Sequence, residues 1–192
     1  VLGDKSSSMQ RAIDMANLVA ATLAKLVKGH VYLVFFDTAP HALEITGLDY
    51  DQILNLTKHM RANGGTSIGC GLQLLRDKSI EVDGIAIVSD GAENSAPMFT
   101  QTYKRYCKQI GKEPAVYLYW VKCDQPNTYN NNPDALANNM AEEGQDLQVF
   151  DLREQTVDFY SLPNLIATMS TQRYGLVEQI MNTPLRSTLE VF

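Results

Sequence analysis

Residues 84–91, GIAIVSDG, form an apolar run that ends abruptly in a carboxylate and a glycine. Residues 85–88 are entirely apolar and mostly β-branched, which is typical of a strand buried on both faces of a sheet. Residues 30–36 (HVYLVFF) and 115–121 (AVYLYWV) have the same character. The chain is therefore expected to build a sheet whose central strands are covered on both sides.

Segments with helical spacing separate these strands. Apolar residues recur at that spacing from Ile13 to Val27, and Lys28 and Gly29 are typical of a helix end. Residues 41–46 alternate like a half-buried strand and predict one antiparallel edge strand beside residues 30–36. Further helices are expected at 49–62, around 72–75, and at 98–112, 135–143, 162–170 and 174–181, with another strand at 147–152. Strand alternating with helix predicts one doubly wound α/β domain with a mainly parallel sheet.

Composition limits the class of protein. The chain has 192 residues, of which 45% are hydrophobic and 20% charged, as in a globular domain, and no apolar run is long enough for a membrane span. A net charge of −6 argues against broad nucleic-acid binding, although Lys104, Arg105 and Lys108 are close enough in sequence for a local basic patch. The three cysteines are widely spaced, which favours reduced thiols and a cytoplasmic location.

The chain begins with Val1, and only three residues precede Asp4. A buried central strand usually runs for about five or six residues. We therefore expect residues 1–192 to be a single domain cut from a longer protein, lacking the start of its first strand and an upstream domain.

Polar residues follow three of the predicted elements. Asp4, Ser6 and Ser8 lie in the turn DKSSS after the first strand, Thr66 lies in a loop between helices, and Asp90 ends the strand at 84–90. In open α/β sheets, sites form at the carboxyl ends of strands. Read singly, each residue also fits an ordinary helix cap or turn. Together they form an all-oxygen donor set, which suits Mg²⁺ or Mn²⁺ and does not suit zinc.

Charge counting indicates what such a site does. Two carboxylates leave a dication electron-poor if one of them binds only through water, and neutral hydroxyls add oxygen donors without quenching that charge. An open coordination position then favours an incoming carboxylate. The pattern therefore predicts a site at which a protein partner supplies an acidic residue as the last ligand.

The order Asp4-x-Ser6-x-Ser8, then Thr66 after two glycines, then Asp90 resembles the metal-ion-dependent adhesion site (MIDAS) of von Willebrand factor A (vWA) domains. The resemblance covers essentially the whole chain and implies a Rossmann-like fold. It implies that Ser6 and Ser8 bind the metal directly, that Asp4 does so directly or through water, and that Thr66 and Asp90 exchange between these modes when a partner binds.

Two residues depart from the family's pattern. Ser7 stands where glycine is common, and Lys5 stands where the family usually has a small or apolar residue. The Lys5 cation either weakens metal binding by repulsion or pairs with an acidic partner, and the sequence does not decide between them.

A second resemblance concerns residues 158–185, which are similar to the tail of the A domain in bacterial relatives of the Ro autoantigen. Those proteins carry an RNA-binding ring, the TROVE module, before the A domain. This resemblance implies RNA association through an upstream domain and a role within a ribonucleoprotein.

The leading hypothesis from the sequence is a non-catalytic, Mg²⁺- or Mn²⁺-dependent protein-interaction domain. The alternative is a metal-dependent phosphoester hydrolase, in which the metal activates a water and Glu93 is the nearest candidate base. Nucleotide binding is the weakest reading, because the first turn has neither a Gly-x-Gly-x-x-Gly fingerprint nor a P-loop.

Overall fold

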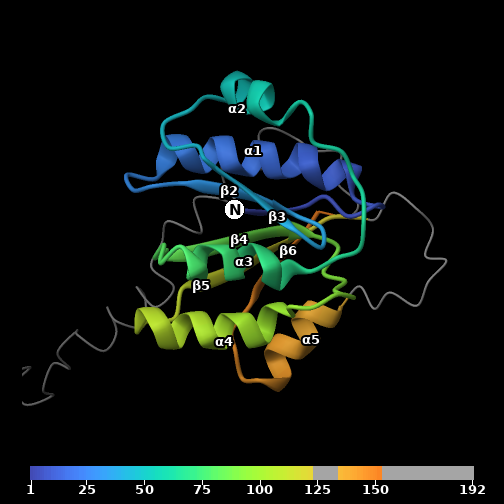
Figure 1. The fold of residues 1–192 in the computed structure, drawn as a ribbon, viewed down its shortest axis with the longest axis vertical. Helices are drawn as coiled ribbons and strands as arrows, with labels where there is room; N and C mark the ends of the chain where they lie inside the picture. Colours follow the sequence, from blue (N-terminus) through green and yellow to red (C-terminus); the bar gives the residue numbers. More distant parts are fainter. Residues whose placement is uncertain (123–133, 153–192) are drawn as a thin grey trace, which may run out of the picture.

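The computed structural model describes residues 1–122 and 134–152, which form one six-stranded sheet with helices on both faces (Figure 1). In chain order the elements are β1 (Leu2–Asp4), α1 (Gln10–Leu26), β2 (Tyr32–Phe36), β3 (Pro40–Glu44), α2 (Tyr50–Thr57), α3 (Ile68–Asp77), β4 (Gly84–Ser89), α4 (Phe99–Ile110), β5 (Ala115–Trp120), α5 (Ala135–Glu142) and β6 (Gln148–Asp151). The helices predicted at 162–170 and 174–181 lie outside the described residues.

The strand order is β3-β2-β1-β4-β5-β6. Only β3 runs antiparallel among these strands; it pairs with β2 at the sheet edge, while the other neighbouring pairs are parallel. The chain thus moves outward from β1 to β3, returns to place β4 beside β1, and continues to β6. The predicted doubly wound α/β sheet with one antiparallel edge strand is confirmed. The reversal lies between β1 and β4, where open α/β sheets form their binding crevice.

Helices α1 and α2 cover one face of the sheet, and α3, α4 and α5 cover the other (Figure 1). Successive side chains of a strand point to opposite faces, so β2 contributes to both layers. Leu33 and Phe35 belong to the apolar cluster under α1, whereas Val34 and Phe36 belong to the cluster under α3 and α4. All four side chains are fully buried, which explains why the run at 30–36 is continuously apolar.

The expected helix at 49–62 is shorter in the structure and ends at Thr57. Its start follows the prediction, because Asp49 and Gln52 form a reciprocal capping box. Beyond the helix, Arg61 Nη1 donates to the carbonyls of Lys58 and Met60 at 2.7 Å. These bonds hold residues 58–62 in a non-helical path, which the apolar periodicity alone does not reveal.

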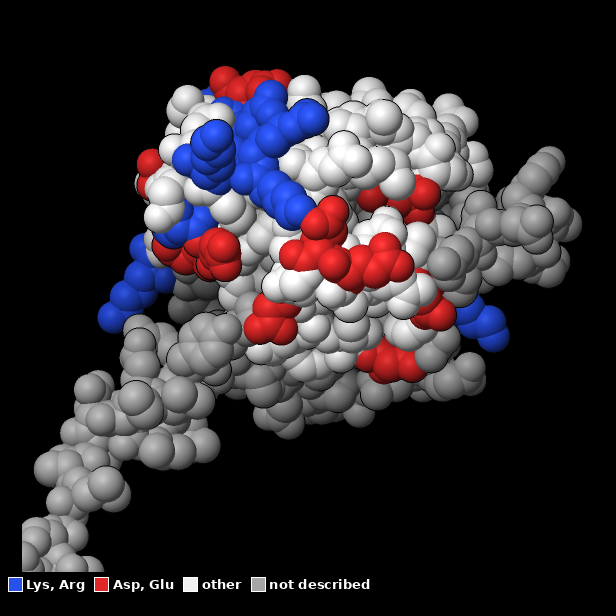
Figure 2. All heavy atoms as spheres, turned by 90° about the horizontal axis from the view of Figure 1, so that it is seen from below, with Lys and Arg blue, Asp and Glu red and all other residues white. Residues whose placement is uncertain are grey.

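The face covered by α4 and α5 carries a basic patch. Figure 2 shows Lys and Arg side chains gathered in one area of it, with Asp and Glu side chains bordering that area and scattered over the rest of the face. Lys104, Arg105 and Lys108 are exposed on α4, as the sequence predicted, and Lys104 forms an ion pair with Glu143. No helix in the described part of the chain is both long enough and apolar enough to cross a membrane.

Gly3 allows α1 to pack directly on β1. A Cβ atom at Gly3 would lie 2.7 Å from the Cβ of Ala16 and 2.9 Å from Cε1 of Phe35, well inside van der Waals contact. Neither neighbour has room to move, because Ala16 and Phe35 are fully buried. Close approach at this position therefore sets how α1 leaves the turn that follows Asp4.

We expect Gly3→Ala to lower the free energy of unfolding by about 1–3 kcal/mol, the usual cost of overpacking a filled core. Gly29→Ala is the matched control, because the nearest atom to a Cβ there is Val27 Cγ1 at 3.9 Å, and its effect should stay within about 0.5 kcal/mol. Urea unfolding of both variants measures the difference. Equal stability of the two variants would contradict the packing argument.

Candidate metal centre

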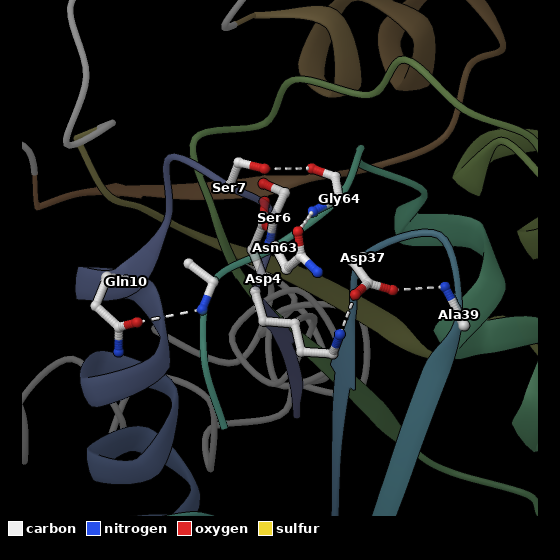
Figure 3. Close-up of polar contacts among 10 residues, drawn as sticks. Asp4, Ser6, Ser7, Gln10, Asp37, Ala39, Asn63 and Gly64 are labelled. Atoms are coloured by element: carbon white, nitrogen blue, oxygen red, sulfur yellow. Dashed lines mark hydrogen bonds and ion pairs between the residues drawn. The ribbon is translucent and has the colours of Figure 1, made fainter. Parts of the chain in front are cut away.

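Three loops meet beyond the carboxyl ends of β1 and β4. The β1–α1 turn is bonded to the α2–α3 loop, since Asn63 N donates to the Lys5 carbonyl at 2.7 Å and Ser7 donates to the Gly64 carbonyl through both N and Oγ, at 3.2 and 3.0 Å (Figure 3). The positive φ of Gly64, 78°, favours glycine at this point of the loop.

The α2–α3 loop is in turn bonded to the β4–α4 loop through Thr66. The Thr66 carbonyl accepts from the backbone N–H groups of Asn94 and Ser95 at 3.0 and 2.9 Å, and Thr66 N donates to Asn94 Oδ1 at 2.9 Å. The predicted site residues of all three loops are therefore held in one region.

Asp4 is the most buried of these residues, with no exposed surface. Its Oδ1 accepts from Ser6 N at 2.8 Å and its Oδ2 accepts from Ser89 Oγ at 2.6 Å. Burial raises the pKa of Asp4 to about 7, the bonds from Ser89 and Ser6 oppose this rise, and the charge of Asp90 adds to it. Asp4 and Asp90 therefore lie close enough to repel each other.

Asp90 is 7% exposed, and its Oδ1 accepts from Ala92 N at 2.9 Å. Burial is the main reason that its pKa is raised above the usual value. Among the described residues, no ion pair involves Asp4 or Asp90. Two buried carboxylates thus lie at the ends of the neighbouring strands β1 and β4, and the described residues form no ion pair with either.

The hydroxyl residues are placed differently from one another. Ser6 and Thr66 are buried, Ser8 is half-buried ahead of α1, and Ser7 is exposed. Within residues 1–122 and 134–152, the hydroxyls of Ser8 and Thr66 make no hydrogen bond, whereas the Ser7 hydroxyl is occupied by the Gly64 carbonyl. The Ser7 hydroxyl is therefore engaged by the α2–α3 loop.

Two supporting residues were missed by the sequence reasoning. Ser89 binds the Asp4 carboxylate, and Asn94 holds Thr66 in place. Ser89 reaches Asp4 because β1 pairs with β4 in the register that sets Gly3 opposite Val88. That register is a property of the folded sheet, so the only sequence signal was the position of Ser89 directly before Asp90.

Lys5 pairs with an acidic residue of its own chain. Its Nζ donates to Asp37 Oδ2, in the turn between β2 and β3, and the side chains are only 16% and 14% exposed. Although burial raises the pKa of Asp37, the bonds from Lys5 and Ala39 N more than offset it and hold that pKa below the usual value. Neither reading of Lys5 left open by the sequence included this intrachain pair with Asp37.

Glu93, the candidate base of the hydrolase alternative, is bonded to two helix starts. Its Oε1 accepts from Gly69 N at 2.9 Å, in the first turn of α3, and its two oxygens accept from Phe99 N, the first residue of α4, at 3.0 and 2.9 Å. A carboxylate at this position caps both helices and faces the positive ends of their dipoles. Burial nevertheless raises the pKa of Glu93 to about 7, against these backbone bonds.

The donor set fits a hard dication. Asp4, Ser6, Ser8, Thr66 and Asp90 offer only oxygen, the preference of Mg²⁺ and Mn²⁺. The described residues bring no three His, Cys, Asp or Glu side chains together, so two carboxylates and neutral hydroxyls make up the centre. A cation there would compensate the buried charges of Asp4 and Asp90.

Solved structures with a similar fold include three whose alignments cover most of this chain. BatB from Bacteroides thetaiotaomicron aligns with a TM-score of 0.58 and 16% identity, covering 89% of this chain and 97% of that chain. A von Willebrand factor type A protein from Catenulispora acidiphila aligns with a TM-score of 0.51 and 15% identity, covering 88% and 40%. The Ro (RSR) protein from Deinococcus radiodurans aligns with a TM-score of 0.52 and 16% identity, covering 85% and 33%.

Sequence comparison identifies no relative, because neither a family model nor a curated protein matches the chain. The structural likenesses, at 15–16% identity, establish the fold: this is a domain with the von Willebrand factor A fold. The resemblance drawn from the DKSSS turn, Thr66 and Asp90 is thus confirmed for the architecture. The chain spans 40% of the Catenulispora protein and 33% of the Ro protein.

We expect Glu93→Gln to change how stability depends on pH in the protein without added metal. In wild type, folded Glu93 keeps its proton up to about pH 7, whereas the unfolded chain loses it near the ordinary pKa of 4.5. The folded state therefore binds more protons within this window, and the free energy of unfolding falls as pH rises through it. Relative to Glu93→Gln, wild type should lose on the order of 2 kcal/mol between pH 4.5 and 8.

Urea unfolding at several pH values measures this difference, and the contributions of Asp4 and Asp90 are common to both proteins. Glu142→Gln, at an exposed position on α5, is the control and should leave the pH profile parallel to wild type. A constant stability difference between wild type and Glu93→Gln would show that burial does not perturb Glu93.

Proposed function

We propose that this domain is a non-catalytic, divalent-cation-dependent protein-interaction module. It binds Mg²⁺ or Mn²⁺ through Asp4, Ser6, Ser8, Thr66 and Asp90, and the bound ion then accepts a carboxylate from a protein partner. The observation that carries the proposal is the burial of Asp4 and Asp90 at the ends of the neighbouring strands β1 and β4, where the described residues provide no ion-pair partner.

Buried charges in proteins are generally paired or bound to metal, because taking an ion out of water is costly. The pair is poorly explained by helix capping, and the turn bonds that the two carboxylates accept from Ser6 N and Ala92 N occupy only Oδ1 of each. Asp4 Oδ2 accepts from a side chain on the neighbouring strand, Ser89, and α1 begins six residues after Asp4 without a side-chain cap bond. Helix capping does not account for the burial of both carboxylates, whereas binding of a cation would.

The donors leave a bound ion electron-poor. Ser6, Ser8 and Thr66 supply neutral oxygen, so only the two carboxylates offset the charge of a dication. The ion would supply Lewis acidity toward an anionic oxygen donor, and an acidic side chain of a partner is the ligand that completes such a site. The crevice at the strand reversal between β1 and β4 is where this fold class binds its ligands.

The hydrolase alternative gains no support from the described residues. Its candidate base, Glu93, is committed to the backbone N–H groups of Gly69 and Phe99. Association with RNA through an upstream domain rests on the resemblance of residues 158–185 and stays a prediction, as does a cytoplasmic location.

The proposal is tested by calorimetric titration of Mn²⁺ and Mg²⁺ into wild type and two variants. Asp4→Asn keeps the size of the side chain, and the Ser89 hydroxyl can accept from the new amide, so the fold should survive. It should weaken metal binding by about 100-fold or more, since loss of a mere supporting partner already costs about 10–100-fold. Glu142→Gln, which makes a matched carboxylate-to-amide change at an exposed position on α5, should bind as wild type does. Equal affinity of wild type and Asp4→Asn would refute the site.

A further inference from the structure

We propose that the ion pair between Lys5 and Asp37 is a positioning device for the metal centre: it fixes the β1–α1 turn relative to the loop that carries Thr66, and so sets the affinity for the cation. This inference rests on the proposed function. It concerns two residues outside the donor set, and it gives the unusual Lys5 a role at the site.

Lys5 stands between two predicted donors, Asp4 and Ser6, so its position determines theirs. Its backbone is held at both ends: Lys5 N donates to the Phe36 carbonyl at 2.8 Å, and the Lys5 carbonyl accepts from Asn63 N at 2.7 Å. Its side chain then reaches the Asp37 carboxylate (Figure 3). Three anchors on one residue fix the turn to β2 and to the α2–α3 loop.

Asp37 extends the same linkage to Thr66. Its Oδ1 accepts from Ala39 N at 2.7 Å, which fixes the carboxylate within the β2–β3 turn. Its carbonyl accepts from Ser67 N at 2.8 Å, at the residue directly after Thr66 and directly before α3. Asp37 therefore touches the DKSSS turn with its side chain and the Thr66 loop with its backbone.

The pair is well placed to hold these loops. Both side chains are largely removed from water, so the interaction is less screened than an exposed ion pair, and removing one partner leaves the other charge uncompensated. By contrast, the pair Lys112–Asp83 lies on exposed side chains, 40% and 97% accessible, and provides a comparison within the same chain.

Positioning and simple electrostatics make opposite predictions for Lys5. A cation beside a dication site repels the metal, so electrostatics alone predicts that Lys5→Met binds Mn²⁺ more tightly. If the pair positions the donors, Lys5→Met binds Mn²⁺ more weakly even though a positive charge has been removed. Asp37→Asn weakens binding under both views, so the sign of the Lys5 effect is decisive.

The experiment is a double-variant cycle measured by Mn²⁺ titration of wild type, Lys5→Met, Asp37→Asn and the double variant. We expect each single variant to lose about 5–30-fold in affinity, and the double variant to lose no more than the weaker single variant, because both remove the same linkage. Lys112→Met, which removes an equal charge at a distance, should bind at least as tightly as wild type.

Amide hydrogen exchange of the metal-free proteins gives an independent readout. The Ser67 and Asn63 amides should exchange faster in Lys5→Met and Asp37→Asn, whereas Val121 N, bonded to the Ser89 carbonyl at 3.0 Å, should be unchanged. Faster exchange confined to the first two amides supports the linkage between the loops. If wild type binds no Mn²⁺, the proposed function and the role of the pair in metal affinity both fall, whereas the linkage itself stands. Unchanged exchange, or tighter Mn²⁺ binding by Lys5→Met with wild type binding normally, overturns the positioning role alone.

Discussion

The burial of the Asp4 carboxylate next to that of Asp90 is the constraint on which the organisation of this domain depends. Hydrogen bonds from Ser89 and from the Ser6 backbone offset part of the cost of burying Asp4, yet its pKa remains raised to about 7. The strands around it could have enclosed an apolar residue more cheaply. We propose that a cation compensates the charges of these two buried carboxylates.

The sheet topology makes this arrangement possible. Because the chain returns after β3 to set β4 beside β1, Ser89 meets Asp4 from 85 positions away in the sequence. Gly3 lets α1 pack on β1. Asn63 and Gly64 bond the α2–α3 loop to the β1–α1 turn, and Asn94 bonds the same loop to the β4–α4 loop. The candidate centre is thus held by backbone and side-chain bonds between loops, rather than by any one element.

Much of the fold could be predicted from the sequence. A strand buried on both faces, such as residues 84–89, is continuously apolar, and a helix buried on one face, such as α1, has apolar residues at helical spacing. The end of α2 could not be predicted. The Arg61 side chain bonds to backbone carbonyls just beyond the helix, and the spacing of apolar residues carries no sign of these bonds. The five candidate donors were found from spacing. The partners Ser89 and Asp37 were not, because each depends on which strands and turns become neighbours.

The binding of a divalent cation at Asp4 and Asp90 is tested by a crystal structure of the protein grown with Mn²⁺, with anomalous scattering used to locate the ion. We expect an anomalous peak at the carboxyl ends of β1 and β4, at about 2.1 Å from the hydroxyl oxygens of Ser6 and Ser8. Asp4, Thr66 and Asp90 should bind the ion directly or through water. A peak bound elsewhere on the protein, or none at this position at saturating Mn²⁺, would contradict this expectation.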